Sequence, residues 1–271
     1  NSTEKLGMAQ HHTATHLLHE VLRQKLGNHV QQAGSFVDSS RLRFDFSHFE
    51  SLSKEDCVQI EAEVNLLISK QYPIHVSTMS LNKAKESGAL ALFGEKYDPE
   101  HVRVVNINNF SVELCAGTHV KHTGMIEAFK IISESAIAAG TRRIEAISGK
   151  TVVHNYLAYE LKKLVEKQKK KLFKCKETQR SKTQYNSIKK DLLNFEKLNL
   201  KKLNIPDLDS HLKQLHSLDI QLLQLAKSWQ KEQQSSTDFI VINLAKECIE
   251  ESKGTIIAKY LKNLDASSLR L

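Results

Sequence analysis

Cysteine and long apolar runs are both scarce in this 271-residue chain. The four cysteines, Cys57, Cys115, Cys175 and Cys248, are scattered and form no CxxC pair. This pattern argues against a disulfide framework and favours a reducing, cytoplasmic compartment. The longest uncharged apolar runs, such as GALALFG and FIVINL, are far too short to cross a bilayer. No signal peptide is recognisable, so we expect no membrane partner.

Glycine is almost absent from the second half of the chain, because nine of the ten glycines lie at or before Gly149. Charge divides at the same place. Residues 1–150 hold 16 Lys/Arg and 17 Asp/Glu, whereas residues 151–271 hold 23 and 14. We therefore predict two regions with different roles that meet near residue 150. Since the first residue is not Met, we also expect a part of a longer protein.

Residues 1–150 alternate between short helices and strands. The segment 13–26 lacks Gly and Pro and repeats leucine every four residues, which predicts a helix that ends at Gly27. A hairpin over 34–46 follows, in which Phe44 and Phe46 point one way and Arg43 and Asp45 the other. Next comes a helix over 53–71 that is capped by Ser53. The other expected elements are a short helix within 80–94 and strands at 74–80, 102–107, 110–114 and 128–135. Because strands follow strands, the predicted fold class is α+β with an antiparallel sheet and packed helices.

Histidines are concentrated near the N-terminus, where His11, His12, His16 and His19 lie within nine residues. On the predicted helix, three of them share one face, and His11 lies off that face. The i, i+4 spacing of His12 and His16 can direct two imidazoles at one point.

A second cluster, CAGTHVKHTG, follows the strand predicted at 110–114. Cys115 and His119 are four residues apart in it, and Gly117 lets the backbone bend sharply between them. Together with His12 and His16, these two residues would supply three nitrogens and one thiolate. That donor set suits Zn²⁺ in tetrahedral geometry.

The residues alone leave this interpretation open. A histidine pair on a helix is also typical of a solvated or hydrogen-bonded face, and His19 and His122 could be alternate ligands. The helical zinc-protease motif is absent, because HTATH has Thr13 and Ala14 where that motif needs a glutamate base. Composition and spacing therefore indicate zinc without indicating a substrate.

A resemblance to a known family supplies the substrate. Seven segments occur in one order at plausible spacings: HHTATHLLH, GNHVQQAGS, LRFDFSH, GALALFGEKY, ELCAGTHV, TGMIEAFKIISES and GTRRIEAISG. Together they closely resemble the editing domain of alanyl-tRNA synthetase, over residues 8–149 nearly continuously. That domain is similar to free-standing alanyl-tRNA editing proteins and, more distantly, to the editing domain of threonyl-tRNA synthetase.

The resemblance implies a deacylase that removes serine, and also glycine, from the tRNA for alanine. In the family, HxxxH and CxxxH bind zinc, which selects His12, His16, Cys115 and His119 here. Two positions depart from the family pattern without removing a ligand. His11 stands where Asn is usual, and CGGTH reads CAGTH.

Further roles follow from the family pattern. Four protein ligands would fill the shell of the metal, which favours zinc as a positioner or structural anchor. Thr15 is expected either to contact the seryl hydroxyl or the water, or to bond its own helix carbonyl. Gln32 matches the pocket glutamine that senses the substrate, although it also suits an ordinary strand. Within a strand, Arg142 and Arg143 face opposite ways, so one would bind phosphate or the terminal nucleotide while the other pairs with Glu145 or another carboxylate.

The region after residue 150 is predicted to be helical. Residues 155–203 contain no Gly or Pro and predict one long helix, NIP at 204–206 breaks it, and residues 207–233 resume helical spacing. These features predict an antiparallel helical hairpin. Between residues 160 and 202 there are 15 Lys/Arg and 5 Asp/Glu. The basic helix could contact RNA, or it could be the solvated face of a coiled coil.

The resemblance arranges these parts as an editing domain (1–150), a basic helical hairpin linker (151–234) and the start of a C-terminal domain (235–271). In the last part we expect a strand at 255–261 and a helix beginning at 265–271. In the family the C-terminal domain binds tRNA and mediates homodimer formation. The ATP-dependent aminoacylation core is absent from this sequence, so this chain should not charge tRNA.

The leading hypothesis is therefore a zinc-containing deacylase of mischarged Ser-tRNA(Ala), within an alanine–tRNA ligase. The alternative is a non-catalytic, zinc-stabilised module that binds tRNA(Ala). A third hypothesis, a coiled-coil segment attached to an inactive domain, is disfavoured by the retained ligand set.

Overall fold

The computed structural model describes residues 2–91, 96–175 and 182–252. Its first element, helix α1 (Ser2–Leu26), begins at Ser2 rather than at the predicted Thr13. The added turns are held in place because the Gln10 amide donates to the carbonyl of Met125 at 2.8 Å. The helix ends where expected, at Gly27, whose φ of +118° is a left-handed conformation that favours glycine.

Two antiparallel sheets follow, in place of the single sheet expected, and they confirm the α+β class. The four-stranded sheet has the order β1-β2-β7-β6, and the three-stranded sheet has the order β3-β4-β5. The first sheet consists of β1 (Gln32–Val37), β2 (Leu42–Ser47), β6 (Phe129–Ala138) and β7 (Thr141–Ser148). The second consists of β3 (Ile74–Met79), β4 (Val102–Ile107) and β5 (Ser111–Leu114).

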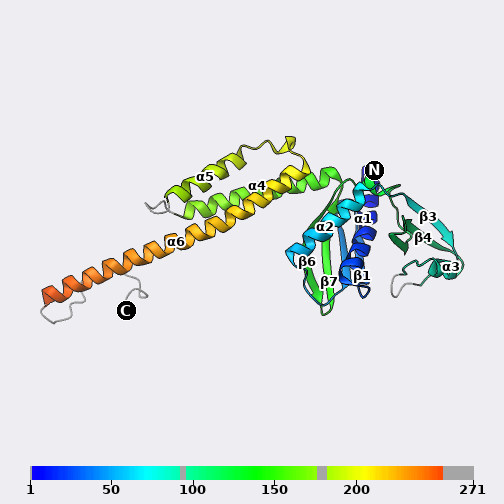
Figure 1. Ribbon diagram of the computed structural model, residues 1–271, viewed down its shortest axis with the longest axis horizontal. Coiled ribbons are helices and arrows are strands. Elements are labelled where there is room, and N and C mark those ends of the chain that lie inside the picture. The colour runs from blue at the N-terminus through cyan, green and yellow to red at the C-terminus, as the bar shows by residue number, and fades with distance from the viewer. Residues whose placement is uncertain (1, 92–95, 176–181, 253–271) are drawn as a thin grey trace. The chain divides into compact units, whose positions relative to one another are not determined.

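Helices α1 and α2 (Lys54–Ser69) cover one face of the four-stranded sheet (Figure 1). The predicted cap of α2 is confirmed, since Ser53 Oγ accepts from the Asp56 N–H and the Asp56 carboxylate accepts from the Ser53 N–H. The alternation predicted for β2 is also confirmed. Phe44 and Phe46 point into the core and are fully buried. Burial of each such side chain contributes about 1.5–3 kcal/mol.

Two short elements complete this part of the chain. Helix α3 (Leu81–Glu86) is capped by Ser80, and the short η1 (Thr123–Ile126) precedes β6. A second, smaller core packs α3 on the three-stranded sheet and is made of Ala84, Ala89, Val102, Val104 and Leu114. Strand β5 thus lies against this core, and its neighbour Cys115 packs against the larger one.

The chain divides into two compact units, Asn1–Tyr156 and Leu157–Leu271. The helices of the second unit are α4 (Lys150–Lys174, which starts in the first unit), α5 (Lys182–Glu196) and α6 (Ile205–Ser252), with the short η2 (Leu200–Lys202) before α6. The single helix predicted over 155–203 is therefore wrong. Among the described residues, those from Lys182 to Ser187 bury no side chain, and burial resumes at Ile188. The start of α5 therefore has no buried apolar stripe that would continue the stripe of α4.

The three helices pack side by side, with α5 antiparallel to the other two (Figure 1). Lys169 of α4 pairs with Glu196 at the far end of α5 at 2.8 Å. Lys171 of α4 pairs with Asp219 of α6 at 2.6 Å, and the buried Gln168 amide donates to the carbonyl of Leu215. The expected antiparallel pair of helices therefore exists as α5 and α6, and α4 packs as a third.

The linker had been expected to end at residue 234. Helix α6 continues past that residue to Ser252. The strand predicted at 255–261 and the helix predicted at 265–271 lie outside the described residues. Within the described residues, every helix is either too short or too polar to cross a membrane.

Candidate metal centre

Four side chains from two distant parts of the chain converge in the first unit. His12 and His16 come from α1, and Cys115 and His119 come from the loop after β5. One potential ligand atom from each residue lies within 4.8 Å of the others. Cys115 Sγ is 3.3 Å from His12 Nε2 and 3.4 Å from His119 Nε2. This group can hold a metal ion, and its donor set is compatible with zinc.

The loop that carries two of the ligands is fixed by the backbone contacts of one arginine. Arg103, on β4, donates from Nη1 to the carbonyl of Cys115 at 2.6 Å and to that of Gly117 at 2.7 Å. A Cβ at Gly117 would lie 1.9 Å from Cε1 of His12. Glycine is therefore needed because the loop passes directly against a ligand ring, and not for the sharp bend predicted from sequence.

The orientation of His16 fits a metal ligand. Its Nδ1 donates to the Glu113 carboxylate at 2.7 Å, and both side chains are almost completely buried. Its Nε2 is buried and has no hydrogen-bond partner in the structure. Such a nitrogen, directed at three other donor atoms, is what a bound cation would satisfy, and a carboxylate on the other ring nitrogen is the usual support of a metal-bound histidine.

His119 is oriented in a similar way. The Thr13 hydroxyl donates to the carbonyl of Ala9 at 2.8 Å and lies 3.3 Å from His119 Nδ1. The hydroxyl can thus accept from Nδ1–H, which leaves Nε2 of His119 free to bind a metal. The Thr13 hydroxyl also accepts from the Val120 N–H at 3.2 Å, so one buried side chain holds the ligand loop against α1.

The charges in the cluster favour the metal-binding form of the cysteine. Burial alone would raise the pKa of Cys115, but hydrogen bonds from His119 and His12 lower it to about 3. Burial is also the main reason that the pKa of His119 falls to about 4. Against its own burial, the pKa of His16 rises to about 10 beside Glu113, so a metal that binds Nε2 must displace a proton from it. The cluster therefore offers a thiolate, which is the form of cysteine that binds metals.

Glu113 and Thr13 were not found by sequence reasoning, although a signal for Glu113 was present. In an extended strand, residues two apart lie on the same face. Glu113 precedes Cys115 by two residues, so it belongs on the side of β5 that faces α1. Thr13 gave no such signal, because nothing in HTATH distinguishes its hydroxyl from that of Thr15.

A cleft of about 530 Å³ opens beside the cluster and is lined by His12, Cys115, Gln32 and Arg103, among others. Gln32 therefore lies next to the metal-type site, and its amide donates to Ser35 Oγ at 3.2 Å. Thr15 is buried, and its hydroxyl donates to the carbonyl of His11 at 2.9 Å. For Thr15, the bond to its own helix is the one present.

Arg142 and Arg143 lie away from the cluster and hold carboxylates bidentately. Arg142 pairs with Glu134 at 2.6 and 2.7 Å. Arg143 pairs with Asp45 across the neighbouring strand at 2.6 and 2.7 Å. The two arginines use opposite faces of β7, as expected, but neither takes Glu145 as its main partner.

His11 has a structural role. It is fully buried, its Nδ1 is 2.8 Å from the carbonyl of Gly7, and its Nε2 accepts from the Ser148 N–H at 2.9 Å. Burial lowers the pKa of His11. This neutral ring joins α1 to the end of β7.

The sequence was compared with known protein families and curated proteins. Residues 102–145, which contain β4, β5 and both loop ligands, match the second additional domain of threonyl and alanyl tRNA synthetases. The chain is 53 % identical to alanine–tRNA ligase 1 of Lachnoclostridium phytofermentans over 160 residues, which are 59 % of this chain and 18 % of that protein. It is 55 % identical to the alanine–tRNA ligase of Helicobacter pylori over 149 residues, which are 55 % of this chain and 18 % of that protein. It is 51 % identical to the alanine–tRNA ligase of Wolinella succinogenes over 176 residues, which are 65 % of this chain and 20 % of that protein.

Residues 102–145 thus resemble the second additional domain of threonyl and alanyl tRNA synthetases, and they carry two of the four metal-type donors, Cys115 and His119. The relatives matched over 149–160 residues are alanine–tRNA ligases, which supports the interpretation of the chain as a fragment of an alanyl-tRNA synthetase. The chain spans about a fifth of the length of the curated relatives it matches.

Proposed function

We propose that the first unit hydrolyses the ester bond of mischarged Ser-tRNA(Ala), and also of Gly-tRNA(Ala), within an alanine–tRNA ligase. The observation that carries this proposal is the set of four metal-type donors, one buried and three half-buried, at the wall of an open cleft. The partner that we propose is tRNA(Ala), and the compartment is the cytoplasm. The domain boundaries at residues 150 and 234 remain part of this proposal.

The proposed site residues are of two kinds, metal ligands and residues that contact the substrate. His12, His16, Cys115 and His119 would hold Zn²⁺. When bound, the ion supplies a positive charge that anchors and orients the aminoacyl group or its attacking water. An aminoacyl ester is already reactive, so the chain contributes mainly by holding the substrate and the water in place.

Selectivity would come from polar groups beside the cluster. Gln32 lines the cleft with an amide that can hydrogen-bond the substrate. Thr15 is proposed as a further contact, through the lone pair that its bond to the His11 carbonyl leaves free. A pocket built to hydrogen-bond a hydroxyl rejects an analogue that lacks it, because the polar groups are then left unpaired. Alanine, which differs from serine by one hydroxyl, would be spared.

The test compares deacylation of Ser-tRNA(Ala) and Ala-tRNA(Ala) by the zinc-loaded chain, with zinc counted by elemental analysis. We expect the seryl ester to be hydrolysed well above the buffer rate and the alanyl ester to be spared. Cys115→Ala should lose both the zinc and the activity. Cys57→Ala is the matched control, because Cys57 lies on α2, is not part of the His/Cys cluster and should keep both.

A second candidate function is a zinc-stabilised module that binds tRNA without hydrolysing it. One observation favours it: the site brings together four protein donors, which would fill the four-coordinate shell typical of structural zinc sites. Zinc-dependent binding of tRNA(Ala) with no deacylation of Ser-tRNA(Ala) above buffer would establish this function and exclude the first. Arg142 and Arg143 stay predicted RNA contacts, which would have to use the guanidinium N–H donors that Glu134 and Asp45 leave free.

A further inference from the structure

One carboxylate joins the metal-type cluster to a third histidine on the same helix. Glu113 accepts from His16 Nδ1 through Oε2 at 2.7 Å and from His19 Nδ1 through Oε1 at 3.0 Å. Ser111 Oγ donates to Oε1 at 3.3 Å. A carboxylate only accepts hydrogen bonds, so both imidazoles must present their protons at Nδ1. When an imidazole that carries its proton at Nδ1 is neutral, its Nε2 is an acceptor.

The two free acceptors have different surroundings. Nε2 of His16 lies with the other donor atoms of the cluster, where a metal would satisfy it. Nε2 of His19 is buried and has no hydrogen-bond partner in the structure, and His19 is 4 % exposed. A buried acceptor without a partner is costly. A ligand that brings a hydrogen-bond donor to His19 would remove this cost.

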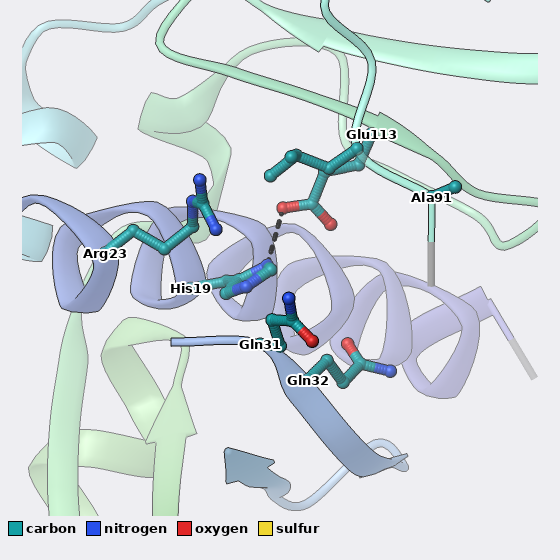
Figure 2. Close-up of a pocket in the computed structure, with 7 residues that line it drawn as sticks. His19, Arg23, Gln31, Gln32, Ala91 and Glu113 are labelled. Carbon is teal, nitrogen blue, oxygen red and sulfur yellow. Dashed lines mark hydrogen bonds and ion pairs between the residues drawn. The ribbon is translucent and has the colours of Figure 1, made fainter. Parts of the chain in front are cut away.

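A cavity of about 130 Å³ lies at His19. Figure 2 shows His19 and Glu113 directed toward each other, with the Gln31 and Gln32 amides on the opposite side. Gln32 also lines the larger cleft beside Cys115, so the cavity adjoins the metal-type site. Along the helix axis, His19 is about 4.5 Å beyond His16, since each residue rises about 1.5 Å. That spacing suits a small group attached to an ester held at the cluster.

We infer that this cavity is the subsite for the hydroxymethyl side chain of the aminoacyl group, whose hydroxyl donates to Nε2 of His19. His19 is then a specificity-determining residue that Glu113 orients. The inference rests on the proposed function and deepens it. An alanyl methyl group or a glycyl hydrogen would leave the acceptor unpaired, so a preference for serine of about 10- to 100-fold is expected.

The experiment measures binding separately from hydrolysis. The probes are the seryl and alanyl amides of 3′-amino-3′-deoxyadenosine, which cannot be hydrolysed as esters, titrated into the full zinc-loaded chain by calorimetry. Wild type should bind the seryl amide at least about tenfold more tightly. In His19→Asn, the shorter amide can still donate to Glu113 but offers no acceptor at the position of Nε2. We expect it to lose the preference while it keeps its zinc and its affinity for the alanyl amide.

Two further variants show whether an effect of His19→Asn comes from the cavity or from a general loss of folding. His29→Asn is the matched control, because His29 is an exposed histidine that pairs with His48 outside the cavity; it should behave as wild type. Ala91→Phe adds bulk at the cavity without removing a hydrogen-bonding side chain, and it should weaken the seryl amide more than the alanyl amide.

Three results would overturn the inference. The first is an unchanged preference for the seryl amide in His19→Asn, and the second is that this variant loses its zinc and its affinity for both amides equally. The third is that wild type binds the two amides with equal affinity. The last result alongside hydrolysis of Ser-tRNA(Ala) would leave the proposed function standing. A seryl preference that depends on His19 in a chain that does not deacylate Ser-tRNA(Ala) would support the subsite and refute the proposed function.

Discussion

Substitution of Glu113 should weaken metal binding while the chain still folds. Its carboxylate fixes the tautomer of His16, and loss of such a partner typically lowers metal affinity by about 10- to 100-fold. We expect Glu113→Gln to reduce zinc affinity by this factor, measured by competition with a chromogenic chelator. Glu61→Gln is the control, because Glu61 is another structural carboxylate, paired with Lys130 on β6. Equal zinc affinity in wild type and Glu113→Gln would contradict this role.

A side chain at Gly117 should disturb the metal-type site by a steric clash. Its substitution by alanine would place a methyl group 1.9 Å from Cε1 of His12, so either the ring or the loop must move. We expect Gly117→Ala to lower the zinc content of the purified chain well below one ion. The neighbouring change, Ala116→Gly, restores the family pattern and should keep the metal. If elemental analysis finds full zinc in Gly117→Ala, then the loop is more pliable than its bonds to Arg103 imply.

At the scale of elements, the capping box of α2 contributes measurable stability. Removing a serine cap costs about 1 kcal/mol. We expect Ser53→Ala to lower the free energy of unfolding of the first unit by about this amount at pH 7, measured by urea denaturation. Ser51→Ala, two residues outside the cap, should have little effect.

The same cap should respond to acid. Hydrogen bonds from Ser53 hold the pKa of Asp56 below its ordinary value. A carboxylate with a lowered pKa in the folded state stabilises the fold above its unfolded pKa and loses that effect as the pH falls. The difference between wild type and Ser53→Ala should therefore shrink in acid.

The elements that could be predicted were those with a local signal. The cap at Ser53, the stop at Gly27 and the alternation of Phe44 and Phe46 each depend on neighbouring residues alone, and all three are confirmed. The division into two sheets depends on pairing between distant strands, which no local pattern records. The helix predicted over 155–203 failed because the absence of Gly and Pro permits a helix without requiring one.

The site shows the same limit. The four metal-type donors could be named because their spacing and the family pattern both mark them, and the structure brings them together. The contact between Thr13 and His119 joins residues 106 apart in sequence, and that between Glu113 and His19 joins residues 94 apart. Such partners become visible only once α1 lies against β5. Sequence reasoning reached the residues that would touch the metal but not those that orient them.

At the scale of the whole molecule, the two units should melt separately. All four metal-type donors belong to the first unit. A ligand that binds only the folded state, at 100 times its dissociation constant, adds about 2.7 kcal/mol, or roughly 5–10 °C for a unit of this size. We expect zinc removal by a chelator to lower only the transition of the first unit in calorimetry. A chelator that shifted both transitions equally would show that the units unfold as one.

The separation of the ligands in sequence also bears on how the chain is made. His12 and Cys115 are 103 residues apart. At roughly 5–20 residues per second, a ribosome needs on the order of 5–20 s to travel between them. During that interval the nascent chain carries only two of the four metal-type donors, His12 and His16. The ion can therefore be captured in full only after the loop that carries His119 has left the ribosome, so metal loading is timed to the completion of β5 and follows the synthesis of most of the surrounding core.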